Sequence, residues 1–196
     1  MAGSGPRVGV LALQGGVREH IRLLDELGAR TSAVRRPEDL EEIDGIVLPG
    51  GESGAISRLL DVVGLREPLL ARLREGLPAY GTCAGLILLA DRVEGAAPGQ
   101  RPLGGIDATV RRNAFGRQNE SFEADLASPD LGDPPVRAAF IRAPVVVQVG
   151  ASVRVLAALP DGRPVAVEDG VRIGTSFHPE VTGETRFHRR LLDRLG

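Results

Sequence analysis

Short apolar runs and stretches of helical periodicity alternate along the first half of the chain. Arg7 to Leu13 is a β-branched apolar run that ends at a Gly-Gly turn, and apolar residues then recur at helical spacing as far as Leu27. The same order repeats up to residue 90. We therefore predict strands over residues 7–13, 29–34, 45–48 and 78–80, and helices over residues 17–27, 56–63, 68–75 and 86–90. Strands that alternate with helices are typical of a parallel sheet.

The second half has a different pattern, with many short strand-like runs and a single helix at the end. The runs cover residues 106–110, 122–126, 136–141, 145–149, 153–159, 164–168 and 171–177, and helical periodicity returns over residues 185–195. Two loops rich in Pro, Gly or Asp, residues 94–101 and 128–135, can be either surface loops or boundaries. We predict an α/β fold, a flavodoxin-like doubly wound and mostly parallel sheet with antiparallel additions, in a single domain over residues 1–196.

Composition narrows the classes of protein that fit. With 196 residues and 42% hydrophobic content, the chain can bury one sizeable core. A formal net charge of -2 gives no field that would attract nucleic acid or an anionic membrane, so neither is expected as a partner. The N-terminus lacks a signal-peptide pattern, and no apolar run approaches the roughly 20 residues of a membrane span, so we expect a soluble protein. Cys83 is the only cysteine, which excludes an internal disulfide and suggests a reduced, cytoplasmic setting.

That single thiol lies in a segment typical of a nucleophile. Gly81-Thr82-Cys83-Ala84-Gly85 joins a predicted strand to a predicted helix, and a sharp turn with this glycine spacing presents its middle side chain at the carboxyl edge of a sheet. A thiol at a helix N-terminus is also favoured as the thiolate, which is the form that attacks. A lone cysteine among apolar residues is more often a small core residue, but the two flanking glycines favour the nucleophile.

A thiolate nucleophile needs a base, and the base needs a group that orients it. His178 directly follows an apolar run, so it lies at a strand end, where α/β sheets place their sites. Glu180 would point to the same side in extended geometry. We therefore predict Cys83, His178 and Glu180 as nucleophile, base and orienting acid. His20 and His188 fall within predicted helices among charged and polar neighbours, and we expect both at the solvated surface.

The oxyanion of an acyl-transfer reaction needs backbone donors. Pro49-Gly50-Gly51-Glu52-Ser53-Gly54 follows an apolar run and opens a helix, so its glycines can present N–H groups to a ligand. We predict the amides of Gly51 and Ala84 as the oxyanion hole. A phosphate-binding loop would need Lys followed by Ser or Thr, which is absent, and Ser53 as a hydrolase nucleophile would need glycine two residues to either side, where Ala55 breaks the pattern.

Together, Cys83, the His178-Pro-Glu180 motif and the PGGES loop resemble the class I glutamine amidotransferases, which carry a Cys-His-Glu triad. The resemblance narrows further, because blocks from the first strand to the triad look like those of the glutaminase subunits of pyridoxal 5'-phosphate synthases. These blocks are Leu13-Gln14-Gly15 with Val17-Arg18-Glu19-His20, Leu48 to Ser53, Gly81 to Leu86, Arg112 to Gln118 (RNAFGRQ), Ser121-Phe122-Glu123, Phe140 to Pro144 (FIRAP) and Ser176 to Glu180. The RNAFGRQ and FIRAP blocks are specific to that subunit.

The resemblance implies a glutaminase that releases ammonia from L-glutamine and passes it to a synthase subunit, its expected protein partner, without a metal or organic cofactor. It also implies that hydrolysis is weak until the partner docks. The implied glutamine site consists of Gly51, Glu52, Ser53, Arg112, Ile141 and Arg142. Arginine suits the α-carboxylate of glutamine on chemical grounds too, although on sequence alone these arginines can equally be surface charges. The family usually has threonine where this chain has Gly54.

Two alternatives remain open. A glutaminase that serves another synthase, such as one of histidine or purine biosynthesis, would carry a similar triad, but the RNAFGRQ block argues against it. A non-catalytic regulator could use the same fold, although it would not need an intact triad.

Overall fold

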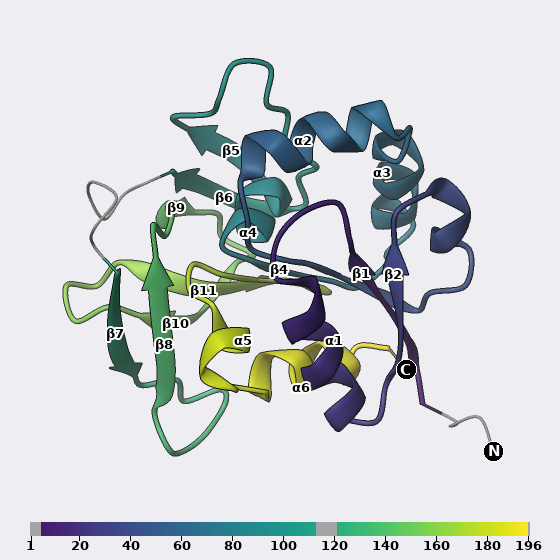
Figure 1. The fold of residues 1–196 in the computed structure, drawn as a ribbon. Coiled ribbons are helices and arrows are strands. Elements are labelled where there is room, and N and C mark those ends of the chain that lie inside the picture. Colours follow the sequence, from purple (N-terminus) through teal and green to yellow (C-terminus); the bar gives the residue numbers. More distant parts are fainter. Residues whose placement is uncertain (1–4, 113–120, 196) are drawn as a thin grey trace.

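The computed structural model describes residues 5–112 and 121–195, and a seven-stranded sheet forms its centre (Figure 1). Its parallel strands are β1 (Arg7–Leu11), β2 (Arg30–Val34), β3 (Gly45–Leu48), β4 (Ala79–Thr82) and β12 (Arg172–Thr175). The antiparallel strands β11 (Pro164–Asp169) and β10 (Arg154–Ala158) extend it in the order β10-β11-β12-β4-β3-β1-β2. The parallel part has the strand order of flavodoxin-like sheets. The predicted mostly parallel sheet with antiparallel additions is therefore confirmed.

Helices cover both faces of this sheet. The first face is packed by α1 (Val17–Glu26), α5 (Pro179–Thr182) and α6 (Arg186–Leu192), and the second by the 3-10 turn η1 (Pro37–Leu40), α2 (Ser53–Val62), α3 (Arg66–Arg74) and α4 (Ala84–Leu89). Two apolar clusters result, one on each face, as the alternation of strands and helices predicts. Tyr80 and Phe187 belong to the first cluster, and Leu48, Ile56 and Leu86 belong to the second.

The remaining strands form two small sheets beside the central one. Strands β5 (Ala90–Glu94), β6 (Ile106–Arg111) and β9 (Val145–Val149) form a three-stranded sheet, and β7 (Ser121–Leu126) pairs with β8 (Val136–Ile141). The sequence pattern missed β5, because we extended a helix through residue 90 and assigned a loop from residue 94. Only Val93 in this strand is β-branched, and the strand is held by pairing with β6 rather than by its own propensity.

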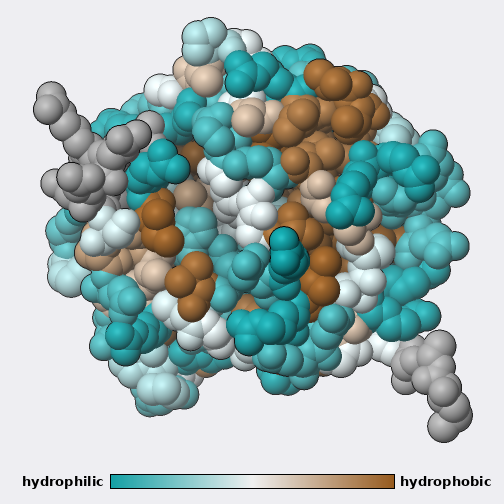
Figure 2. Space-filling model, viewed as in Figure 1, coloured by the Kyte–Doolittle hydropathy of each residue, from teal (hydrophilic) through white to brown (hydrophobic). Residues whose placement is uncertain are grey.

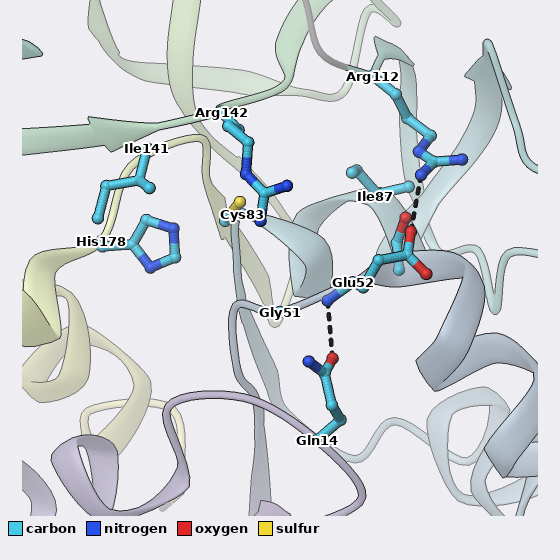
Figure 3. Close-up of a pocket in the computed structure, with 10 residues that line it drawn as sticks. Gln14, Gly51, Glu52, Cys83, Ile87, Arg112, Ile141, Arg142 and His178 are labelled. Carbon is cyan, nitrogen blue, oxygen red and sulfur yellow. Dashed lines mark hydrogen bonds and ion pairs between the residues drawn. The ribbon is translucent and has the colours of Figure 1, made fainter. Parts of the chain in front are cut away.

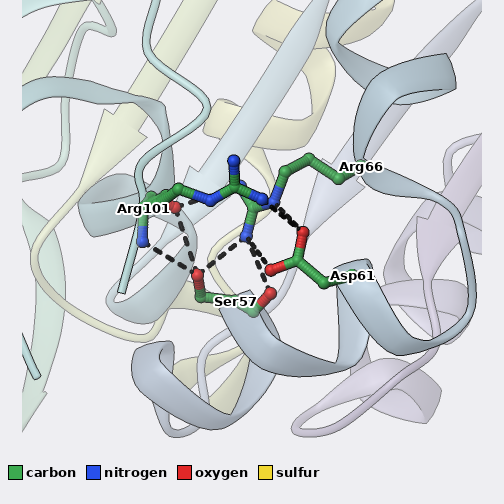
Figure 4. Close-up of polar contacts among 4 residues, drawn as sticks. All are labelled: Ser57, Asp61, Arg66 and Arg101. Atoms are coloured by element: carbon green, nitrogen blue, oxygen red, sulfur yellow. Dashed lines mark hydrogen bonds and ion pairs between the residues drawn. The ribbon is translucent and has the colours of Figure 1, made fainter. Parts of the chain in front are cut away.

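A buried arginine ties the loop before β6 to α2 (Figure 4). The Arg66 side chain is only 3% exposed, and it donates to the backbone oxygens of Ser57 and Arg101 and to the Asp61 carboxylate. The Ser57 hydroxyl in turn accepts from the Arg101 amide, with an N···O distance of 3.0 Å. The loop is thus fixed by polar contacts to the helix that begins at the PGGES motif.

Hydrophobic surface gathers over α2 and α3 (Figure 2). Val62, at the end of α2, is 79% exposed, and Val63 after it is 36% exposed. No helix in the described residues is long and apolar enough to cross a membrane.

Candidate active site

A pocket lies where four neighbouring parallel strands, β1, β3, β4 and β12, end (Figure 3). Such edges are where open α/β sheets bind ligands. The cavity has a volume of about 260 Å³, near the lower limit for small-molecule sites, which suits a ligand the size of an amino acid. Its lining residues are Gln14, Gly51, Glu52, Ser53, Cys83, Ile87, Arg112, Ile141, Arg142 and His178.

Cys83 is held in a strained turn between β4 and α4. Its φ of 49° and ψ of -98° place it in a region that non-glycine residues rarely adopt, and such outliers gather at functional sites. The Cys83 amide donates to the Thr175 oxygen on β12 over 2.7 Å, which fixes the turn to the neighbouring strand. A Cβ on Gly81 would lie 2.4 Å from the Gly85 carbonyl carbon, so the turn needs glycine there. The predicted strand-to-helix elbow is therefore present.

His178 and Glu180 form a hydrogen-bonded pair beside this thiol. His178 Nδ1 lies 2.7 Å from Glu180 Oε1, and the His178 amide donates to the Ala139 oxygen of β8. The expected extended geometry is wrong: β12 ends at Thr175, and Pro179–Thr182 forms the one-turn helix α5 with His178 as its N-cap. Proline at the first helical position favours that turn, which carries Glu180 back towards the imidazole.

In this pair, Glu180 favours the protonated form of His178, and His178 favours the ionised form of Glu180. Burial by itself lowers the pKa of His178, but hydrogen bonds and charge from Cys83 and Glu180 raise the pKa to about 10. Burial raises the pKa of Glu180, yet the hydrogen bond from His178 and the nearby His20 and His178 leave its pKa below the usual value. An ionised Glu180 beside a protonated His178 is therefore the favoured state.

The PGGES loop lies against the loop that follows β1. The Glu52 amide donates to Gln14 Oε1 over 2.7 Å, and the Gly16 amide donates to the Gly50 oxygen. The Gly51 amide has no acceptor among the described residues. Ala84 is the first residue of α4, and its N–H is one of the four at a helix start that lack a partner within the helix.

Charged side chains line the other side of the pocket. Arg112 Nη2 donates to Glu52 Oε1 over 2.8 Å, while the same carboxylate caps α2 by accepting from the amides of Gly54 and Ala55. Burial raises the pKa of Glu52, but the amides of Ala55 and Gly54 and the charge of Arg112 lower it below its usual value. Arg142 follows β8 with a positive φ of 46°, which is again a rare conformation at the pocket.

Gly54, where the family usually has threonine, is closely surrounded. A Cβ at this position would lie 3.0 Å from the Ala97 Cβ and 3.2 Å from Glu52 Oε2. The absence of a side chain at this position thus matches the local packing of this chain.

The structure brings together nearly all the residues that the sequence singled out. Every predicted glutamine-site residue lines the pocket with Cys83 and His178, whereas Glu180 and Ala84 are buried and do not line it. No sequence signal indicated a role for Gln14 or Ile87, although Gln14 directly follows a predicted strand that ends at the same sheet edge. Most of the RNAFGRQ block, residues 113–118, lies outside the described residues.

The prediction for the other two histidines is wrong. His20 and His188 are both fully buried, and His20 Nδ1 lies 2.8 Å from His188 Nε2. A sequence signal for this exists: His20, Leu23 and Leu24 follow the spacing of a core-facing helix stripe. The charged residues beside His20 in the sequence point instead towards a solvated helix face.

Comparison with known proteins agrees with this site. The sequence matches the SNO glutamine amidotransferase family over residues 10–195. It is 60% identical over 193 residues to the pyridoxal 5'-phosphate synthase subunit PdxT of Clavibacter sepedonicus, covering 98% of this chain and 92% of that protein. The protein of the same name from Leifsonia xyli subsp. xyli is 58% identical over 195 residues, covering 100% and 98%.

Solved structures give the same result. A crystal structure of a glutamine amidotransferase superimposes with a TM-score of 0.89 at 46% identity, covering 96% of this chain and 98% of that chain. PurLQS from Thermotoga maritima gives a TM-score of 0.73 at 18% identity, covering 98% and 100%, which shows a shared fold alone. Since the family match and these relatives extend over almost the whole sequence, the chain belongs to the SNO glutamine amidotransferase family.

Proposed function

We propose that this chain is the glutaminase subunit of a pyridoxal 5'-phosphate synthase, hydrolysing L-glutamine to L-glutamate and ammonia. The observation that carries the proposal is the pairing, in one pocket, of a strained Cys83 with a His178 that is hydrogen-bonded to Glu180. The relatives named as PdxT, at 58–60% identity, support the assignment to vitamin B6 synthesis rather than to another pathway.

In the proposed mechanism the Cys83 thiolate attacks the γ-amide carbon of glutamine. The tetrahedral intermediate collapses as His178 protonates the departing nitrogen, which leaves as ammonia and gives a γ-glutamyl thioester. His178 then takes a proton from water, and the resulting hydroxide attacks the thioester to release glutamate and the thiolate. Glu180 holds His178 through Nδ1, so the other imidazole nitrogen is free for these transfers.

The amides of Gly51 and Ala84 are the proposed donors to the oxyanion. Both are backbone groups without a partner in their own segment, which is the condition for binding a negative charge that develops during the reaction. The Glu52 amide in the same loop already donates to Gln14, so it is not available to the oxyanion in this conformation. Which N–H groups of the loop face the pocket therefore depends on the conformation of the loop.

Recognition of glutamine is assigned to the charged rim of the pocket, with Gly51, Ser53 and Ile141 completing its walls. The Glu52 carboxylate suits the α-ammonium group, and Arg112 and Arg142 suit the α-carboxylate. Since Arg112 and Glu52 are bonded to each other here, substrate would exchange part of that contact for its own.

The synthase subunit is the proposed partner and the acceptor of the ammonia. The single cysteine is free, which fits a reducing compartment, so we also propose that the protein works in the cytoplasm. A regulator without catalysis is disfavoured, because it would have no need of a strained cysteine beside a charged histidine.

The test is ammonia release from glutamine by this chain alone and with its cognate synthase subunit. The wild-type pair should hydrolyse glutamine faster than the single chain, and Cys83→Ala should abolish hydrolysis while it still binds the synthase. Ser176→Ala, which changes a buried hydroxyl outside the pocket lining, serves as the control and should retain activity. Hydrolysis that survives in Cys83→Ala would rule out this mechanism.

A further inference from the structure

Behind the catalytic pair, on the face of the sheet covered by α1 and α6, lies a second pair of histidines. His20 from α1 and His188 from α6 are fully buried and 168 positions apart in sequence, and their ring nitrogens are in hydrogen-bond contact over 2.8 Å. His20 Nε2 lies 3.2 Å from the hydroxyl of Thr82, the residue before Cys83. Two buried imidazoles are costly to place in a core unless their polar atoms are used.

The same imidazole faces the catalytic carboxylate. Glu180 Oε1 is bonded to His178, but the buried Oε2 atom has no hydrogen-bond partner among the described residues. His20 Nε2 lies 3.6 Å from that atom. A buried anionic oxygen is stabilised by any N–H dipole directed at it, and in the described residues His20 is the group in this position.

The hydrogen of neutral His20 can lie on either ring nitrogen, and the position of Glu180 distinguishes the two forms. If His188 Nε2 donates to His20 Nδ1, then the hydrogen of His20 lies on Nε2 and is directed towards Thr82 and Glu180. The opposite arrangement would direct a nitrogen lone pair at a carboxylate oxygen, which is repulsive. Ionised Glu180 therefore favours the Nε2–H form of His20. In this form His188 Nε2 is the donor to His20 Nδ1, and the buried His188 Nδ1 has no hydrogen-bond partner among the described residues.

Both histidines are uncharged near neutral pH. Burial is the main cause that lowers the pKa of His20, against the opposing effect of Glu180 and with a further lowering by His178. Burial and His20 lower the pKa of His188 to about 3. The other titratable groups around His20 are Glu19 on its own helix and Tyr80, whose ring lies edge-on to it from β4. The pair thus acts as neutral dipoles.

We propose that His20 is a positioning residue for the triad, which directs its Nε2–H towards the second carboxylate oxygen of Glu180 and keeps Glu180 ionised and aligned with His178. The inference rests on the proposed function, because it takes Cys83, His178 and Glu180 as the reacting set. His20 itself does not touch the substrate pocket.

The direct test needs no substitution. The chain has three histidines, so a long-range ¹H–¹⁵N spectrum of the labelled wild-type protein at neutral pH resolves the protonation of each ring. His20 should show a protonated Nε2 and an unprotonated Nδ1. The reverse form at His20, or a charged ring, would overturn the proposal even if no variant folds.

A second test follows the alkylation of the only cysteine by iodoacetamide across pH, with the full chain alone. In His20→Phe the N–H is lost, Glu180 becomes a weaker partner for His178, and the midpoint of the alkylation profile should move up by about one pH unit. In the complex with the synthase, kcat near pH 7 should then fall about tenfold with little change in KM. His20→Gln, whose side-chain amide can supply an N–H in place of Nε2, should stay close to the wild-type midpoint.

Leu24→Ala is the matched control, because Leu24 is buried one turn further along α1. It should lower stability without moving the alkylation midpoint. If His20→Phe also leaves the midpoint in place, or if His20→Gln moves it as far as His20→Phe does, His20 is only a core residue. Neither measurement uses glutamine, so failure here is distinguishable from loss of the glutaminase function, which the Cys83→Ala experiment tests.

Discussion

Glycines set how closely the reacting groups of the triad can approach the PGGES loop. A Cβ on Gly50 would lie 2.3 Å from Cε1 and 2.9 Å from Nδ1 of His178, so the imidazole fits against the loop only because residue 50 has no side chain. The sequence identified this loop as a source of backbone donors. The loop also packs against the imidazole of His178. This contact joins segments 128 positions apart in the sequence, so the local sequence pattern does not predict it.

At this scale we predict that Gly50→Ala loses catalysis while the protein still folds. The new methyl group must push His178 aside, and a displacement of about 1 Å from productive geometry costs about 100-fold in rate. Glutamine hydrolysis in the complex measures the loss. Gly45→Ala is the control, because its Cβ, at the other end of β3, would lie 2.7 Å from the end of the Leu195 side chain, which is flexible and can move aside. Equal rates for Gly50→Ala and wild type would contradict the observed packing.

Among the elements, α2 connects the site with its surroundings. It begins at Ser53, next to the Glu52 cap, and its middle is fixed through Ser57 and Arg66 to the loop that precedes β6. Gln100 in that loop accepts from Arg112, which in turn bonds to Glu52. The helix was predictable from its periodicity, whereas these polar links join distant segments and were not.

We predict that Arg66→Met destabilises the protein by about 2 kcal/mol, because it removes the buried hydrogen bonds that the guanidinium donates to the Ser57 and Arg101 carbonyl oxygens. The Arg101 oxygen would keep only the longer bond from the Ser57 hydroxyl. Since the loop positions Gln100, the KM for glutamine should also rise. Urea unfolding and steady-state kinetics of the complex give the two readouts. Arg22→Met removes an exposed i,i+4 ion pair with Glu26 and should change stability by less than about 0.5 kcal/mol. If both variants lowered the free energy of unfolding by similar amounts, the buried Arg66 contacts would stabilise the protein no more than an exposed ion pair does.

At the scale of the whole molecule, Glu168 links the C-terminal helix α6 to the central sheet. This carboxylate on β11 accepts two hydrogen bonds from Arg190 on α6 and one from Arg194 after it. Burial raises the pKa of Glu168, but the hydrogen bonds and charges of the two arginines lower it below the ordinary value of 4.5. A carboxyl whose pKa is lowered by folding stabilises the folded state above its unfolded pKa and loses that contribution as the pH falls through its folded pKa.

Glu168→Gln should therefore lower the free energy of unfolding by about 2 kcal/mol at pH 7, since the bonds to the arginines lose their charge. The difference from wild type should shrink as the pH falls below about 4.5, and urea unfolding at several pH values measures it. The exposed pair of Glu123 and Arg137 offers a control, because Glu123→Gln should have little effect at any of these pH values. A difference that is constant with pH would argue against a lowered pKa for Glu168.

A single unfolding transition in these urea curves would also support the predicted single domain.

The sequence by itself determined the features that depend on neighbouring residues. Alternating strands and helices indicated the parallel sheet, the glycine spacing indicated the Cys83 elbow, and a strand end followed by His-Pro-Glu indicated the base and its acid. These signals are local, because strand, turn and helix preferences act over a few residues. The resemblance to glutaminase subunits of pyridoxal 5'-phosphate synthases then supplied the glutamine site and the partner.

Only the tertiary structure decided which polar groups are buried and what they contact. His20 and His188 have charged neighbours and were predicted at the surface, yet packing of α1 and α6 on the sheet buries both and brings them together behind Glu180. Likewise Gln14 reaches Glu52 because β1 and β3 are adjacent in the sheet, not in the sequence. Burial and hydrogen bonding depend on the whole set of neighbours in space, which is why the local pattern gave the reacting residues but not the residues that hold them in place.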